Sequence, residues 1–212
     1  AIFSGGTLGV VDTAGSRVLV VDPGDPKAQG VEFTGGGGEG RILSPTAIDA
    51  QDGRVYVADS SDGSVREYEE SGNFLRIMSF ESPGPTFVGG LCLDGETLWV
   101  SDSNADRVIA VNLATGAQSG TLQRRLGLPR GVAVTQSGRI MVAETFGRRI
   151  SVFDPSGTSI IDLFPDAFTE GILNDGLLEA PESLVWDEGS SRLYVTDVNA
   201  GRIKVYNYLQ ED

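Results

Sequence analysis

The sequence predicts an all-β protein: a β-propeller of about five four-stranded blades in a single domain, residues 1–212. A short β-rich segment ends in an acidic residue at five places, and these acids are 47, 43, 42 and 53 residues apart. That period is typical of a propeller blade. Short runs of Val, Ile and aromatic residues are separated by Gly turns, and this pattern also indicates an all-β fold. The acids are Asp12, Asp59, Asp102, Glu144 and Asp197.

Each blade is expected to contain four strands in the same order. The first strand is small and apolar, and three first strands are introduced by Pro45, Pro129 or Pro181, where proline removes no ladder hydrogen bond. A tight turn leads to the second strand, which ends in the acid, and the third strand begins five residues after the acid. A Gly turn and a fourth strand complete the unit. The predicted blades are residues 1–34, 43–80, 86–122, 127–164 and 178–208.

The segment LPRGVAVTQSGRIMVAETFGRRISVFDPSGTSIIDLF at residues 127–164 resembles an NHL repeat, and residues 43–80 and 174–207 are similar to it. The resemblance covers nearly the whole chain. It implies a propeller that can form part of a six-bladed ring, because NHL proteins have six blades as a rule. NHL proteins include protein scaffolds, RNA binders and a few lyases, so the resemblance implies the fold more strongly than any activity.

The predicted strands do not complete a ring. Alignment of the repeats places residues 1–3 inside a first strand, and residues 207–212 are too short and polar to form a fourth strand. The count is one strand short of five blades and more than a blade short of six. Unpaired strands are templates for pairing. We therefore expect the edge near Tyr206 to be covered, either by residues of a longer polypeptide or by another chain, through self-association or a tight hetero-complex.

The repeated acids are predicted to be structural. In four blades an arginine follows five residues later and faces the acid across a turn, while blade two has Ser64 at that position. A motif present in every blade is better explained as a hairpin clasp than as a catalytic group. Such a pair, if partly exposed, contributes about 0.3–1 kcal/mol. The predicted clasp residues are Asp12, Arg17, Asp59, Asp102, Arg107, Glu144, Arg149, Asp197 and Arg202.

Composition argues against several classes of function. The net charge of −14, from 16 basic and 30 acidic residues, argues against nucleic acid, because a phosphate backbone is bound mainly by Lys and Arg. No apolar run approaches the roughly 20 residues of a membrane helix, so no membrane insertion is expected. The chain has no histidine, which excludes Ser-His-Asp catalysis and the histidine-bound metal of the NHL-fold lyases. Cys92 stands alone and is expected to act as a small hydrophobe.

Two functions remain open. The preferred one is a non-catalytic NHL-type scaffold, without a cofactor, that binds a protein partner or assembles with copies of itself. The alternative is a calcium-assisted hydrolase or lactonase with a carboxylate-lined central channel, because lactonase-type propellers hold Ca²⁺ there with oxygen ligands. Asx residues in turns more often satisfy the local backbone. We expect a secreted, periplasmic or extracellular location and leave a cytoplasmic one open. The candidate calcium ligands are Asp62, Asn104, Asp106, Asn174, Asp175 and Asn199.

Overall fold

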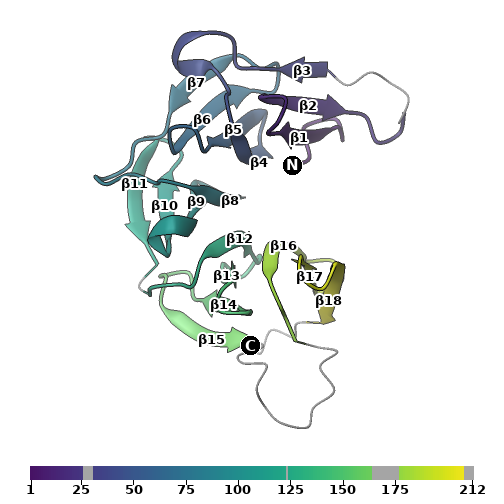
Figure 1. The fold of residues 1–212 in the computed structure, drawn as a ribbon, viewed down its shortest axis with the longest axis vertical. Coiled ribbons are helices and arrows are strands. Elements are labelled where there is room, and N and C mark those ends of the chain that lie inside the picture. Colours follow the sequence, from purple (N-terminus) through teal and green to yellow (C-terminus); the bar gives the residue numbers. More distant parts are fainter. Residues whose placement is uncertain (26–30, 123, 164–176, 208–212) are drawn as a thin grey trace.

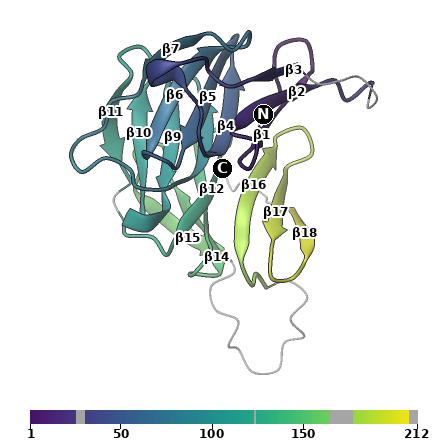
Figure 2. The ribbon, with the colours of Figure 1, turned by 45° about the horizontal axis from the view of Figure 1, so that its top comes forward.

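The computed structural model describes residues 1–25, 31–122, 124–163 and 177–207, which form five antiparallel sheets around a common axis (Figures 1 and 2). Each sheet is one blade of a β-propeller, as predicted. Helical structure in these residues is limited to two single 3-10 turns, η1 (Gly38–Gly40) and η2 (Ser103–Ala105).

The strands follow one another in each blade as an up-and-down meander. Blade one contains β1 (Leu8–Asp12), β2 (Arg17–Val21) and β3 (Val31–Phe33). Blade two contains β4 (Pro45–Gln51), β5 (Arg54–Asp59), β6 (Ser64–Glu69) and β7 (Phe74–Ile77). Blade three contains β8 (Val88–Asp94), β9 (Thr97–Asp102), β10 (Arg107–Asn112) and β11 (Ala117–Thr121). Blade four contains β12 (Pro129–Val134), β13 (Ile140–Glu144), β14 (Arg149–Phe153) and β15 (Ser159–Leu163). Blade five contains β16 (Pro181–Asp187), β17 (Arg192–Asp197) and β18 (Arg202–Asn207).

Local sequence explains why the chain reverses where it does. Strands β4, β12 and β16 begin at the three predicted prolines. In blade two, Asp52 and Gly53 join β4 to β5 with φ of 52° and 76°. Two successive positive φ values match the twist of a tight hairpin, and Asp-Gly adopts them readily. The first and second strands of each blade are therefore placed in register by short turns.

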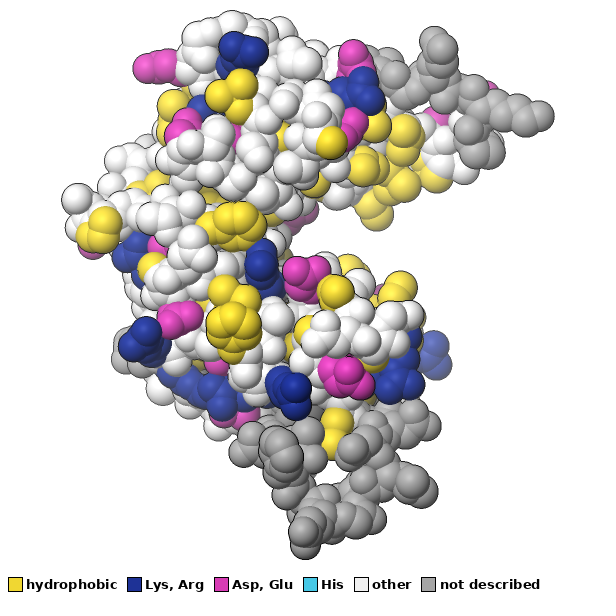
Figure 3. Space-filling model, in the orientation of Figure 1, with side chains coloured by type: hydrophobic (Ala, Val, Ile, Leu, Met, Phe, Trp, Pro, Cys, Tyr) yellow, Lys and Arg dark blue, Asp and Glu magenta, His cyan; other side chains and the backbone are white. Residues whose placement is uncertain are grey.

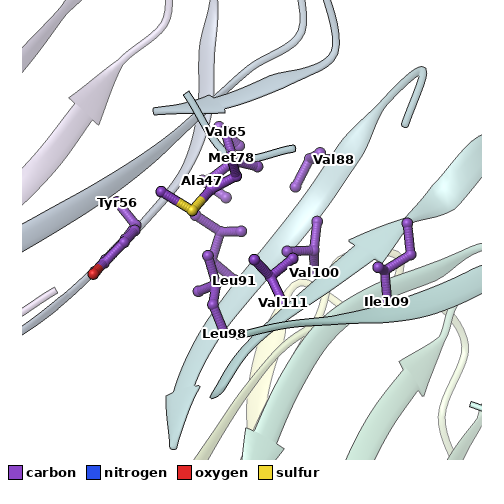
Figure 4. Close-up of a cluster of buried hydrophobic side chains, with 11 residues drawn as sticks. Ala47, Tyr56, Val65, Met78, Val88, Leu91, Leu98, Val100, Ile109 and Val111 are labelled. Atoms are coloured by element: carbon purple, nitrogen blue, oxygen red, sulfur yellow. The ribbon is translucent and has the colours of Figure 1, made fainter. Parts of the chain in front are cut away.

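The hydrophobic core lies between the blades. Four buried clusters each span one pair of neighbouring sheets, because the strands carry apolar residues on both faces. Figure 4 shows the cluster between blades two and three, where Tyr56 and Met78 of one sheet lie across from Leu91 and Val100 of the next. Trp99 is partly buried and packs against the cluster between blades three and four.

The ring formed by these blades is open. The inner strands pack in the order β1, β4, β8, β12 and β16, and within the described residues no comparable packing joins β16 back to blade one. Figure 1 shows the opening between β1–β3 and β16–β18, and Figure 3 shows a notch in the molecular outline at this place. The opening leaves one sheet face on each side without a neighbouring blade.

Residues 1–3 do not form the expected strand. Ile2 makes an isolated bridge with Leu8, and the Gly9 N–H donates to the Ala1 carbonyl at 2.9 Å. They occupy the position next to β1 that a first strand occupies in the other blades. In blade five, β18 ends at Asn207. Residues 208–212, for which no fourth strand was predicted, lie outside the described residues.

Candidate functional site

The acid-arginine pairs form salt bridges in three blades. Strand register places each acid directly opposite the arginine of the next strand. The arginine Nε lies 2.9 to 3.0 Å from a carboxylate oxygen, in the pairs Arg17–Asp12, Arg107–Asp102 and Arg149–Glu144.

Blades two and five use a different cation. Arg66 Nη1 lies 3.6 Å from Asp59, and Lys204 Nζ lies 3.0 Å from Asp197. Each cation is two residues beyond the position aligned with the arginines. Residues two apart in a strand point to the same face, so the cation still reaches the acid. This periodicity was the signal in the sequence that could have identified Arg66 and Lys204.

The acids are more buried than the sequence suggested. The side chain of Asp12 is 27% exposed, so blade one matches the expected partly exposed pair. The acids of the other four blades are at most 1% exposed. Removing one of these acids should therefore cost more stability than removing a member of a surface pair, because it leaves a buried charge without compensation.

The buried acids also bind the backbone that leads into the first strand. Glu144 accepts from the Gly127 N–H at 2.6 Å, and Asp197 accepts from the Glu179 and Ala180 N–H groups at 3.0 and 2.8 Å. Burial raises the pKa of Glu144, but hydrogen bonds from Arg149, Ser151 and Gly127 outweigh it and hold the pKa below its ordinary value. The carboxylate stays ionised and fully engaged, as a structural group requires.

The described candidate calcium ligands come from three hairpins, with Asn104 and Asp106 together on the one between β9 and β10. Asp62 binds Arg66 at 2.6 Å, and Asp106 binds Arg125 at 3.0 Å and the Leu128 N–H at 3.1 Å. Asn104 and Asn199 are exposed. Asn174 and Asp175 lie outside the described residues. Within the described part of the chain, no three His, Cys, Asp or Glu side chains lie close enough together to hold a metal ion.

Blade five presents an apolar sheet face to the opening. We call this the open face; it consists of Val185, Tyr194, Thr196, Ile203 and Val205, which the strand register places on one side of the sheet. Val185 is 59% and Ile203 65% exposed. The aligned residues of blade four pack against blade five and are at most 5% exposed: Ala133, Met141, Ala143, Ile150 and Val152.

Blade one borders the other side of the opening with the face that, in blade two, packs against the preceding blade. Leu8 and Val10 of β1 align with Val55 and Val57 of blade two, which are fully buried against blade one. Val10 is 44% exposed. The opening is therefore bordered by two apolar faces. They correspond to the two faces that pack together at the interfaces between the other blades.

A central cavity of about 420 Å³ lies on the propeller axis. Residues of all five blades line it, and its two charged lining residues are Arg130 of β12 and Glu182 of β16. A second cavity, of about 370 Å³, lies between the other ends of the inner strands and includes Cys92. Burial raises the pKa of the Cys92 thiol to about 12, in keeping with its expected role as a small hydrophobe. Arg130 was not among the site residues predicted from the sequence. The signal that could have identified it is that the residue type at this position differs from blade to blade.

Comparison with known proteins agrees with the blade geometry. The human protein named NHL repeat-containing protein 3 is 23% identical over 172 residues, which are 71% of this chain and 47% of that protein. The chain is a β-propeller, and this similarity supports blades of the NHL type. No family model matches it. This propeller spans about half the length of the curated relative it matches.

Solved structures show the same fold at low sequence identity. A chain from the crystal structure of a nidogen/laminin complex superposes on this propeller with a TM-score of 0.75 and 20% identity, covering 95% of this chain and 73% of that one. The computationally designed Ika4 protein has a TM-score of 0.59 at 15% identity, covering 80% and 94% of the two chains. In the described part of the propeller, no helix is long and apolar enough to cross a membrane.

Proposed function

We propose that this propeller is a non-catalytic assembly scaffold that binds a second copy of the chain through the open face of blade five. The observation that carries the proposal is the exposure of Val185 and Ile203, whose counterparts in blade four are buried by the next blade. An apolar sheet face of this kind is typical of an interaction surface.

A second copy fits this face because it carries the complementary surface. At each of the four described blade interfaces, one face of a blade packs against the opposite face of the blade that follows it. Blade five exposes the face that in blades one to four packs against the following blade. Blade one, through Leu8 and Val10, exposes the face that in the later blades packs against the preceding blade. Blade five of one copy can therefore pack against blade one of the next, in a head-to-tail contact that closes into a ring or extends further.

Strand β18 adds main-chain hydrogen bonding to this surface. Within the described residues β18 pairs with β17 alone, and no described strand lies along its outer edge. Strand addition takes affinity from main-chain bonds and register from alternate side chains. Ile203 and Val205 lie on the open face of this same strand, so one partner can contact the edge and the face together.

The use of the repeat acids supports a structural role. Asp102, Glu144 and Asp197 are buried, and each is bound by a cation and by backbone N–H groups. A general acid or base must reach its substrate, and these carboxylates are already occupied. The alternative of a calcium-assisted hydrolase would need ligands that converge, and in the described residues no three His, Cys, Asp or Glu side chains do so.

The test is sedimentation of the 212-residue chain over a range of concentrations. We expect an assembly larger than one chain, which the double substitution Val185→Glu with Ile203→Glu converts to a monomer. Phe146→Glu is the matched control, because Phe146 is 79% exposed on a hairpin of blade four, away from the open face. A wild-type monomer at all concentrations would overturn the proposal, as would a double variant that assembles like the control.

Complementation distinguishes the head-to-tail contact from other modes of self-association. Val10→Glu on blade one should also abolish assembly. A mixture of the Val10→Glu chain with the blade-five double variant should form a heterodimer, because one intact face of each kind remains. Absence of the heterodimer would contradict the head-to-tail contact, and binding only to unrelated added proteins would identify a different occupant.

A further inference from the structure

Arg130 is an arginine without a carboxylate partner in the central cavity. Its guanidinium carbon lies 4.9 Å from the centroid of the Phe87 ring, and its Nε–H is shielded and has no hydrogen-bond acceptor among the described residues. The arginines of the clasps, by contrast, each contact an acid. A cation–π contact positions the charge but offers its N–H groups no acceptor.

The site around Arg130 departs from the repeat. The aligned first-strand positions in the other blades are Thr46, Gly89 and Glu182. At Gly89 a Cβ atom would lie only 2.9 Å from Arg130 Cδ, so the glycine leaves the space that the arginine side chain occupies. The pair of Gly89 and Arg130 indicates a feature specific to this cavity rather than a general part of the blade.

The cavity walls indicate what such a cation would bind. Inner-strand residues Ile48, Leu91 and Val132 contribute apolar surface, while hydroxyl groups come from Ser183 and Thr196. Thr196 Oγ1 accepts the Ser183 N–H at 2.8 Å, which leaves its own O–H free to donate. A cavity of this size that combines apolar walls with a few polar groups is typical of a small-molecule site.

The charges favour an anion with a single negative charge. Arg130 is the one cation of the lining, and Glu182 is the one carboxylate. A dianion would be attracted by Arg130 and repelled by Glu182, and the single positive charge of Arg130 would balance only one of its two negative charges. A carboxylate matches the planar donor fork of a guanidinium, and an apolar body would contact the Phe87 ring and the walls. We infer that the central cavity binds a small monocarboxylate with an apolar body, held by Arg130.

The test is isothermal titration of the chain with benzoate and hexanoate, alongside the neutral benzamide and hexanamide. We expect the acids to bind at least tenfold more tightly than the amides of the same shape. Arg130→Gln should weaken acid binding at least tenfold. Arg130→Lys keeps the charge without the fork and should give an intermediate affinity. Arg148→Gln, at an exposed arginine of the same blade, should bind like the wild type.

Several results would overturn this inference. They are equal binding of acid and amide, no binding of either acid, unchanged affinity in Arg130→Gln, and tighter binding of phosphate or sulfate than of benzoate. Circular dichroism and melting would first show that each variant is folded. If Arg130→Gln does not fold, Phe87→Leu replaces it, because loss of the ring should weaken benzoate binding while the arginine remains.

Discussion

Glu144 and Asp12 occupy the same repeat position, and the structure predicts very different costs for their removal. Glu144 has no exposed side-chain surface and accepts hydrogen bonds from Arg149, Ser151 and the Gly127 N–H. Asp12 is 27% exposed and pairs with a partly exposed arginine. Burial, rather than the identity of the partner, distinguishes them.

Glu144→Ala should lower the free energy of unfolding by about 3–5 kcal/mol, the range for removing one partner of a buried ion pair. For a domain of this size each kcal/mol corresponds to about 2–4 °C in melting temperature, so we expect a fall of roughly 6–20 °C. Asp12→Ala should cause a much smaller fall, because solvent already screens that pair.

The measurement is urea and thermal unfolding followed by tryptophan fluorescence, which reports on Trp99 in blade three and Trp186 in blade five. Glu144→Gln serves as the control for side-chain size, and it should lose stability because Arg149 then keeps only its longer contact with Asp162, at 3.5 Å. Equal losses for Glu144→Ala and Asp12→Ala would refute the argument that burial sets the contribution of the clasp.

The same residue predicts a dependence on pH. The pKa of Glu144 in the folded chain is below its ordinary value. The stabilisation is therefore fully present above the unfolded pKa of about 4–5 and is lost as pH falls through the folded value. The stability difference between wild type and Glu144→Gln should shrink as pH is lowered from 7 toward 3. A difference that stays constant over this range would contradict the prediction.

Three further predictions follow from packing. Gly131→Ala should destabilise the chain in thermal melting, because its Cβ would lie 2.7 Å from the Leu184 nitrogen, while Gly37→Ala, with no atom within 4 Å, should be nearly neutral. Trp99→Ala should cost on the order of 3–5 kcal/mol in urea unfolding, since its ring packs between blades three and four; a loss below 1 kcal/mol would contradict this packing. Cys92 should react with a thiol reagent at pH 8 only in denaturant, because burial raises its pKa to about 12; rapid reaction of the folded chain would disprove this.

The spacing of the acids was sufficient to predict the blades, because a propeller is built from local hairpins. Strand pairing between Glu144 and Arg149, or between Asp12 and Arg17, depends only on a short turn that the sequence itself encodes. Period-two alternation then places apolar residues on both faces of every sheet.

Contacts between blades could be decided only by the tertiary structure. The pattern around Val185 is the same whether or not another blade covers it, so its exposure depends on where the ring opens. The burial of Asp102 and Glu144 likewise depends on how the segment that leads into the first strand of the blade folds over them, with Thr86 and Gly127 donating their backbone N–H groups. Arg130 and Phe87 meet across two blades, and no local spacing connects them. Local hydrogen bonding determines each blade from its own residues, whereas burial is a property of the surfaces that the assembled ring brings together.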